Sequence, residues 1–316
     1  MESLKRKIQH SIIKMKSLLK DKKFHSQHVV KRMEELDVAN PVIPEKALFN
    51  FSIDFEIVWG NGETNGKEIS SEQRIQNALV QARAFGPFMD MLDEIGFPIT
   101  WATLGRLANP DRIPPQESAF NPDWSIDWYD SHYKNLENQI WDGTSYLDRI
   151  KEAKVDHEVQ SHGYAHIDYS DSSTSEKVAA WDIETSLMEL RSYGFEVNGF
   201  VYPCNRPRYE NLLPKNGVEI IRGIDQSWIT QGELKKTPLG FWISPAIYGL
   251  DDMIKIIDHA VERKSFIHPW MHLIECDLNE DDIENFYRPI FEYILKLQRD
   301  GLVENISFKR INELLK

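Results

Sequence analysis

The sequence EVQSHGYAH at residues 158–166 joins a short strand-like run to two histidines four residues apart, His162 and His166. An earlier run of the same kind ends in two carboxylates, Asp54 and Glu56. Two neutral imidazoles and one carboxylate can hold a divalent ion while leaving positions open for water and substrate. A second carboxylate beside them can accept a proton from that water. Together the two segments indicate a hydrolytic metal site.

Strand-like runs alternate with amphipathic stretches from residue 47 onward. The predicted strands are 47–54, 97–104, 157–162, 199–203, 219–224, 265–268 and 305–308, and the predicted helices are 71–95, 144–153, 174–194, 207–216, 249–263 and 280–299. This alternation implies repeated strand–helix–strand crossovers and a mainly parallel sheet. Polar residues gather at the carboxyl ends of these strands, where barrel enzymes build their sites. We therefore predict an α/β fold, an irregular (β/α)7 barrel resembling a TIM barrel.

Four motifs in a fixed order carry a family resemblance. They are Ser-Ile-Asp-Phe-Glu (52–56), Ser-His-Gly-Tyr-Ala-His (161–166), Tyr-Pro-Cys-Asn (202–205) and Phe-Ile-His-Pro-Trp (266–270). The set resembles the successive motifs of the polysaccharide deacetylase family, also called the NodB-homology domain or carbohydrate esterase family 4. The resemblance extends over roughly residues 47–310, the size expected of one barrel.

The resemblance implies that His162 and His166 are metal ligands. It also implies that the family's two aspartates, here Asp54 and Glu56, divide into a general base and a third ligand. Side chains two residues apart in a strand point to the same side, so both can face the ion. We assign Asp54 as the base and Glu56 as the ligand. The reverse assignment stays open, because either carboxylate can reach the ion.

The family's last motif supplies a histidine that acts as the general acid. His268 matches this motif at a predicted strand end, and His272 is the competing candidate. The four-residue spacing of the two histidines also fits a second metal pair, but this interpretation is disfavoured because no carboxylate motif besides Glu275 and Asp277 accompanies it. His268 is the predicted acid.

Cys204 marks a departure from the third motif, in which many family members carry an arginine that pairs with the catalytic aspartate. Arg206, Arg208 or, from the next predicted strand, Arg222 could take over this contact. Otherwise Asp54 lacks an orienting partner. Cys204 itself is interpreted as a small packing residue, since no base stands beside it in the sequence.

Aromatic residues indicate how a substrate is held. Residues 109–143 are longer than a normal loop after a barrel strand and are rich in Trp and Tyr, which either stack on sugar rings or anchor the loop to the barrel. Trp228 and Trp270, both next to strand ends, are predicted to line the pocket. Asn205 and Arg206 are the further candidates for substrate binding.

The resemblance implies metal-dependent removal of an N-acetyl or similar small N-acyl group from a sugar, with one divalent ion, zinc before other metals. A lipid- or nucleotide-linked precursor of a surface polysaccharide is the expected substrate. Two other classes stay open. One is a non-catalytic carbohydrate-binding relative, favoured by the missing arginine, and the other is an amidohydrolase acting on a non-sugar amide such as a ureide.

Charge and composition limit the partners. A net charge of -13 argues against nucleic acid as the main partner, because phosphate binding needs a basic surface. Two cysteines, Cys204 and Cys276, suit a reducing compartment. No stretch resembles a secretory signal or a membrane span, so a cytoplasmic location is expected.

The first 23 residues carry eight Lys or Arg against two acids, a local charge of +6. Their apolar residues recur at helical spacing, which predicts an amphipathic helix. That helix lies either on the anionic inner face of a membrane or against protein, including a partner subunit of a homo-oligomer. Pro41 and Pro44 interrupt the helical pattern. We therefore divide the chain into a basic helix and linker at 1–44 and a barrel domain at 45–316.

Overall fold

The computed structural model describes residues 44–60, 63–64, 67–112, 114–115, 140–223, 234–240, 242–244, 247–248, 253–273 and 282–314. The helix predicted near the N-terminus lies outside these ranges, as do Trp228 and Cys276. Among the described helices, none combines the length and the apolar character that a membrane crossing requires.

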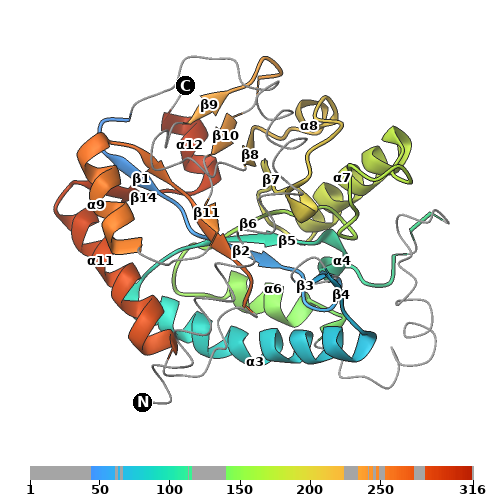
Figure 1. Ribbon diagram of the computed structural model, residues 1–316, viewed down its shortest axis with the longest axis horizontal. Coiled ribbons are helices and arrows are strands. Elements are labelled where there is room, and N and C mark those ends of the chain that lie inside the picture. The colour runs from blue at the N-terminus through green and yellow to red at the C-terminus, as the bar shows by residue number, and fades with distance from the viewer. Residues whose placement is uncertain are drawn as a thin grey trace.

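A parallel sheet forms the centre of the molecule, with helices around it (Figure 1). Its strands are bonded in the order β10 (Trp242–Ser244), β8 (Ile220–Arg222), β7 (Gly199–Phe200), β6 (Glu158–Ser161), β5 (Thr100–Thr103), β2 (Ser52–Phe55), β13 (Pro269–Met271) and β11 (Ile247–Tyr248). The two outer strands of this order, β10 and β11, follow each other in the chain. These parallel strands with helices outside them confirm the predicted irregular barrel.

The first barrel strand is split into two parts that have different neighbours. Its first part, β1 (Ala47–Phe49), pairs with β12 (Phe266–Ile267) and β14 (Val303–Asn305), whereas its second part, β2, pairs with β13 and β5. Asn50 lies at the split and donates from Nδ2 to Thr100 Oγ1 at 2.9 Å and to the Ile306 carbonyl at 2.7 Å. This side chain therefore joins the strands where β14 and β5 diverge.

Two short antiparallel pairings add to the barrel. They are the hairpin of β3 (Glu63–Thr64) and β4 (Lys67–Glu68), and the pairing of β9 (Lys235–Lys236) with the barrel strand β10.

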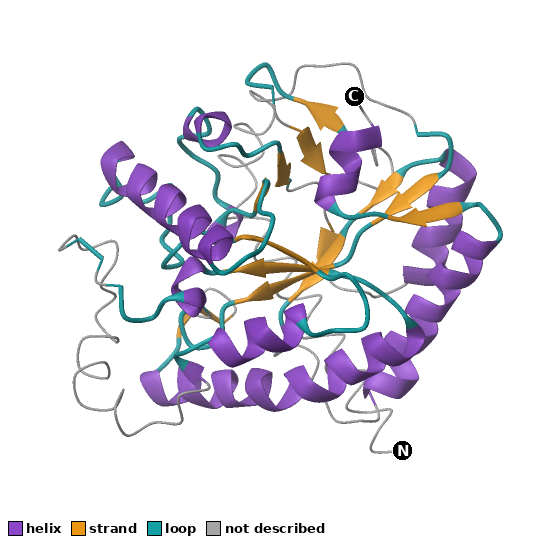
Figure 2. Ribbon diagram, turned by 180° about the vertical axis from the view of Figure 1, so that it is seen from behind, coloured by secondary structure: helices purple, strands orange, loops and turns teal. Residues whose placement is uncertain are grey.

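Helices lie outside the strands, as the strand–helix alternation predicts (Figure 2). The described helices are α3 (Ser71–Ile95), α4 (Gly105–Ala108), α6 (Thr144–Lys151), α7 (Glu176–Ser192), α8 (Leu212–Lys215), α9 (Met253–Arg263), α11 (Arg288–Arg299) and α12 (Phe308–Leu314), with a 3-10 turn η3 (Pro203–Asn205) and a π-helical turn η5 (Ile283–Tyr287). The longest, α3, begins where the Ser70 hydroxyl accepts from the Gln73 amide and ends at Gly96, whose φ is 74°.

The last predicted strand, 305–308, is shifted relative to the observed β14 because Phe308 begins α12. The Glu158 carboxylate accepts from the backbone amides of Phe308 and Lys309, each at 2.9 Å, and so satisfies the start of that helix. Phe308 is fully buried, and a Cβ on Gly199 would lie 2.3 Å from its ring. The helix is therefore fixed by a carboxylate distant in sequence, which no local pattern reveals.

His157, just before β6, is expected to make stability depend on pH. Its Nδ1 accepts from the Ile99 amide at 3.2 Å, and burial lowers its pKa from the ordinary value of 6.5 to about 4. Protons therefore bind the unfolded chain more readily, and stability is lost as the pH falls from 6.5 towards 4. The shift corresponds to roughly 3 kcal/mol. Urea unfolding at pH 7 and pH 4.5 should show a smaller loss for His157→Gln than for the wild type; parallel losses would contradict this.

Candidate metal centre

The end of β2 places two carboxylates inside the barrel. Asp54 is 3% exposed and Glu56 1%. Directly after Glu56 the backbone turns through Ile57, whose φ of 50° is rare for a β-branched residue, and the Trp59 amide donates to the Glu56 carbonyl at 3.1 Å. A Cβ at Gly60 would lie 1.4 Å from Glu56 Oε2, so only glycine leaves room for this carboxylate. The turn therefore fixes Glu56 in place.

A buried aspartate on α7 organises the loop that carries the two histidines. The Asp182 carboxylate accepts from the Tyr164 amide at 2.8 Å, from the Ala165 amide at 3.0 Å and from the Tyr169 hydroxyl at 2.6 Å. Gly163, with φ of 78°, begins this loop, and a Cβ there would lie 2.8 Å from Asp182 Oδ2. Sequence reasoning did not find Asp182, because it belongs to an ordinary amphipathic helix and no motif marks it.

Asp182→Asn is expected to weaken metal binding by roughly 10- to 100-fold, because side chains that orient ligands typically contribute that much. An amide oxygen cannot replace a carboxylate that accepts three hydrogen bonds. Competition with a chelator measures the affinity, and Tyr169→Phe, which removes one of the three donors, should have a smaller effect. Unchanged metal affinity in a destabilised Asp182→Asn protein would restrict Asp182 to a purely structural role.

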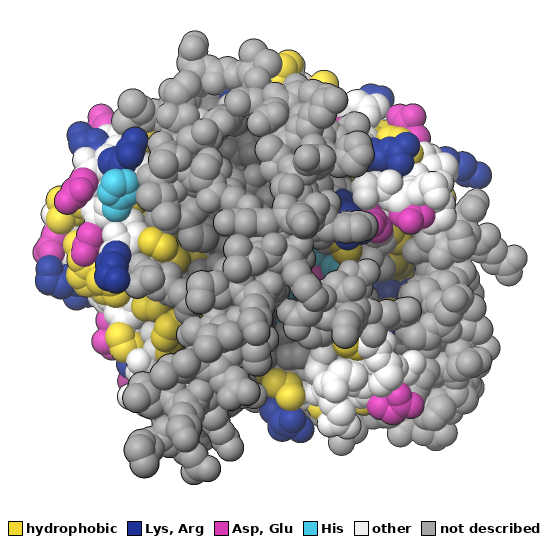
Figure 3. All heavy atoms as spheres, in the orientation of Figure 1, with side chains coloured by type: hydrophobic (Ala, Val, Ile, Leu, Met, Phe, Trp, Pro, Cys, Tyr) yellow, Lys and Arg dark blue, Asp and Glu magenta, His cyan; other side chains and the backbone are white. Residues whose placement is uncertain are grey.

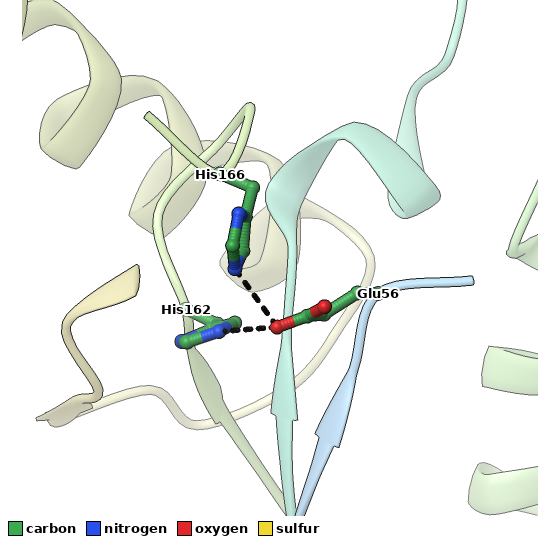
Figure 4. Close-up of side chains that lie close together, drawn as sticks. All are labelled: Glu56, His162 and His166. Carbon is green, nitrogen blue, oxygen red and sulfur yellow. Dashed lines mark hydrogen bonds and ion pairs between the residues drawn. The ribbon is translucent and has the colours of Figure 1, made fainter. Parts of the chain in front are cut away.

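Glu56, His162 and His166 converge on one point (Figure 4). The Glu56 Oε1 atom lies 2.9 Å from Nε2 of each histidine. His162 Nδ1 is 2.9 Å from the Val201 carbonyl, which can only accept, so this nitrogen carries the proton. In the neutral ring Nε2 is then an acceptor that faces a second acceptor on Glu56. Such contacts require a proton or a cation between the two atoms, and this donor set is that of catalytic zinc sites.

The charges of this cluster favour the same interpretation. Burial alone raises the pKa of Glu56, but His166 and His272 outweigh it and hold that pKa well below its usual range. Burial lowers the pKa of His166, but the Glu56 carboxylate outweighs it and raises that pKa. The ionised form of Glu56 is therefore stabilised by nearby positive charge, and a divalent ion would supply such a charge directly.

His272 lies at this centre, and His268 does not. His272 Nε2 is 3.6 Å from Glu56 Oε1, and His272 forms a second potential cation-binding group with Asp54 and Glu56. His268 is 1% exposed, and its two ring nitrogens contact the hydroxyls of Ser244 at 2.8 Å and Ser52 at 2.9 Å. The alternative of a second metal pair formed by His268 and His272 is therefore not supported by the geometry.

The prediction of His268 as the general acid is also inconsistent with this geometry. Burial and then Arg222 lower the pKa of His268 well below its ordinary value, which disfavours the charged imidazolium form that a general acid needs. The reason for the error is local. The predicted strand 265–268 ended at His268, but β12 ends at Ile267 and a further strand, β13, runs from Pro269 to Met271, so the side chain that follows the last strand is His272.

Of the three candidate arginines, Arg222 on β8 is the one that contacts Asp54. Its Nη1 pairs with Asp54 Oδ1, and its Nη2 donates to Asp54 Oδ2 at 2.7 Å. It also donates to Ser52 Oγ at 3.2 Å and to Asn205 Oδ1 at 3.4 Å, and its guanidinium lies 4.1 Å from the ring centroid of Trp270. Burial alone raises the pKa of Asp54, but Arg222 and His162 outweigh it and lower that pKa. Arg222 and His162 thus favour the ionised form of Asp54.

The other two candidate arginines are engaged elsewhere. Arg206 pairs with Asp168, and Arg208 donates to the Ser170 carbonyl at 3.4 Å. Arg206 thereby links the loop after β7 to the loop after His166.

Cys204, with φ of 56°, is exposed, so its interpretation as a packing residue is wrong.

The loop at 109–143 is described only near its two ends. Trp141 is fully buried there, and its carbonyl accepts from Trp59 Nε1 at 3.2 Å. This aromatic residue anchors the loop to the barrel. Trp124, Trp128, Tyr129 and Tyr133 lie outside the described residues.

The centre is reachable from outside the molecule. His166 and His272 keep 15% and 19% of their side chains exposed, whereas His162 keeps 1%. A histidine side chain is visible near the middle of the face shown in Figure 3.

Comparison with known proteins identifies the fold. No family model matches the chain, and no curated protein does either. Among solved structures, one described as a polysaccharide deacetylase from Mycobacterium smegmatis matches with a TM-score of 0.57 and 12% identity, over 88% of this chain and 94% of that one. The chain has the fold of the polysaccharide deacetylases.

Two further structures have the same fold. A polysaccharide deacetylase from Pseudomonas aeruginosa PAO1 matches with a TM-score of 0.57 and 11% identity, over 85% of this chain and 90% of that one. Puue allantoinase matches with a TM-score of 0.53 and 11% identity, over 88% of this chain and 97% of that one. Likenesses at this identity establish the architecture alone.

Proposed function

We propose that this protein is a metal-dependent hydrolase that removes an N-acetyl or similar small N-acyl group from a sugar. The observation that carries the proposal is the convergence of Glu56, His162 and His166 beside Asp54, which Arg222 keeps ionised. A divalent ion, zinc before other metals, would polarise the amide carbonyl and lower the pKa of a water molecule when bound.

Asp54 is the proposed general base. Its Oδ2 atom lies 3.8 Å from His162 Nε2, so the carboxylate is adjacent to the ligand cluster and can accept a proton from water there. Arg222 holds both carboxylate oxygens, which fixes their direction. As the water oxygen bonds to the carbonyl carbon, its proton passes to Asp54.

His272 is the proposed general acid. Breaking the carbon–nitrogen bond leaves an amine that must gain a proton. His272 is partly exposed and lies on the same side of the barrel as Glu56, with its ring 5.7 Å from that of Trp270. It can therefore reach a leaving group held above the carboxylates, and Trp270 orients its ring.

The sugar assignment is supported by the fold shared with two polysaccharide deacetylases. A precursor of a surface polysaccharide, linked to a nucleotide or a lipid, is the proposed substrate. The +6 charge of residues 1–23 favours a lipid-linked one at an anionic membrane. The fold is also shared with an allantoinase, which supports a ureide as the second candidate substrate class.

An acetate-release screen tests the proposal. Metal-stripped and zinc-loaded protein would be incubated with N-acetyl sugars that are free, nucleotide-linked or lipid-linked, and with allantoin as the ureide. Acetate released only by the loaded protein is the expected result. Turnover of allantoin alone would replace the sugar assignment, and sugar binding without acetate release would support the non-catalytic alternative.

A further inference from the structure

His268 belongs to a buried chain of hydrogen bonds that starts at the base. From Asp54 the chain runs through Arg222 to Ser52 Oγ at 3.2 Å, and from Ser52 to His268 Nε2 at 2.9 Å. From His268 Nδ1 it continues to Ser244 Oγ at 2.8 Å. Strands β2, β8, β10 and the residue between β12 and β13 contribute these side chains.

One set of hydrogen positions gives every group in this chain a partner. Arg222 can only donate, so Ser52 Oγ accepts from it and turns its own hydrogen to His268 Nε2. His268 then carries its proton on Nδ1 and donates to Ser244 Oγ. Ser244 in turn donates to the Ile221 carbonyl, 3.4 Å away. With a neutral His268 protonated on Nδ1, the side chains of Arg222, Ser52, His268 and Ser244 all have hydrogen-bond partners.

The surroundings of His268 keep the ring neutral and immobile. Phe266 stacks on it with centroids 6.0 Å apart, and Phe308 meets it edge-on at 5.3 Å. The positive charge of Arg222 lies beyond a single serine, so a charged imidazole would be both desolvated and repelled. A protonated Nε2 would moreover make Ser52 Oγ accept from both neighbours and leave the Ser52 hydrogen without an acceptor in this chain.

We infer that His268 is a positioning residue that fixes Arg222, and through it the base Asp54, by holding the Ser52 hydroxyl in its accepting orientation. The catalytic consequence rests on the proposed function of Asp54. The geometric part of the inference, namely the tautomer of His268 and the placement of the Arg222 guanidinium, does not depend on that function, because both exist without a substrate.

Nitrogen-15 NMR of the histidine rings and of the Arg222 guanidinium tests the geometric part. The expected result is a neutral His268 protonated on Nδ1 at pH 7, together with separate, slowly exchanging Nη signals of Arg222. Ser52→Ala and His268→Leu should merge those Arg222 signals, whereas Thr103→Val, which removes another buried hydroxyl on the adjacent strand, should not. A His268 protonated on Nε2, or Arg222 signals indifferent to Ser52→Ala, would overturn the inference.

Kinetics on two kinds of acetyl group test the catalytic part. A sugar amide needs a general acid for its leaving amine, whereas an aryl acetate does not. Ser52→Ala and His268→Leu should slow both reactions equally, by roughly tenfold, and the double variant should be no slower than either single one. His272→Gln should slow the amide selectively.

Two kinetic results distinguish a positioning role of His268 from a role as the general acid and from a failure of the proposed function. A selective loss of amide cleavage in His268→Leu would make His268 the acid and overturn its positioning role. If the wild type turns over neither compound, the proposed function fails, and the inference is then decided by the NMR signals of His268 and Arg222.

Discussion

Asp54→Asn is expected to lower turnover by roughly 100-fold or more while leaving the metal content nearly unchanged. The amide that replaces the carboxylate cannot accept a proton at neutral pH, so water activation is lost. The three proposed ligands are untouched, because Glu56, His162 and His166 form their cluster without Asp54. Turnover on the substrate found by the screen and metal content by elemental analysis are the two measurements.

Glu56→Gln is the matched control, because it also exchanges a buried carboxylate for an amide on the same strand end. It should lose the metal together with the activity. Loss of metal from Asp54→Asn, with Glu56→Gln still loaded, would mean that the base and the third ligand have been exchanged.

His162→Ala is expected to abolish stoichiometric metal binding and to lower turnover by roughly 100-fold or more, since the several kcal/mol that an ion contributes are lost. Its Nε2 lies 2.9 Å from Glu56, and its Nδ1 is held by the Val201 carbonyl, so the ring orientation is fixed for a ligand. Metal content, circular dichroism and turnover would be measured on one preparation.

A histidine remote from the centre provides the control for this variant. His259→Ala, on the outer helix α9, should keep both metal and activity. Full metal occupancy in a folded His162→Ala protein would contradict the assignment of His162 as a ligand.

The fold was predictable where local signals were complete. The helix at 71–95 matches at both ends, because Ser70 and Gly96 are strong start and stop signals. The strands β10 and β11 were not predicted. They are two or three residues long, and Pro245, which stands between them in the sequence, argues against a strand. They pair with β8 and β13, each 22 positions away, and no local pattern contains such a pairing.

The sequence predicted some residues of the metal centre better than others. Asp54, Glu56, His162 and His166 lie together, as their places at predicted strand ends and the family resemblance led us to expect. Arg222 could only be named among three arginines, because its contact with Asp54 spans 168 positions.

Two parts of the site could not be predicted from the sequence: the choice between His268 and His272 as the acid, and the role of Asp182 in holding the histidine loop. His268 and His272 were confused because a strand end was placed too early, and strand ends are the least certain feature of such predictions. Asp182 acts through burial and hydrogen bonds to a loop 17 and 18 positions away, which only the folded chain brings together.

Titration of metal-free protein with zinc, read out as acetate release, tests the central claim most directly. Activity on the N-acetyl sugar should rise in proportion to added ion and level off at one ion per chain, because the described part of the chain offers one group of two histidines and a carboxylate. Glu56→Gln should stay inactive throughout the titration. Full turnover by the stripped wild-type protein in the presence of a chelator would contradict the account.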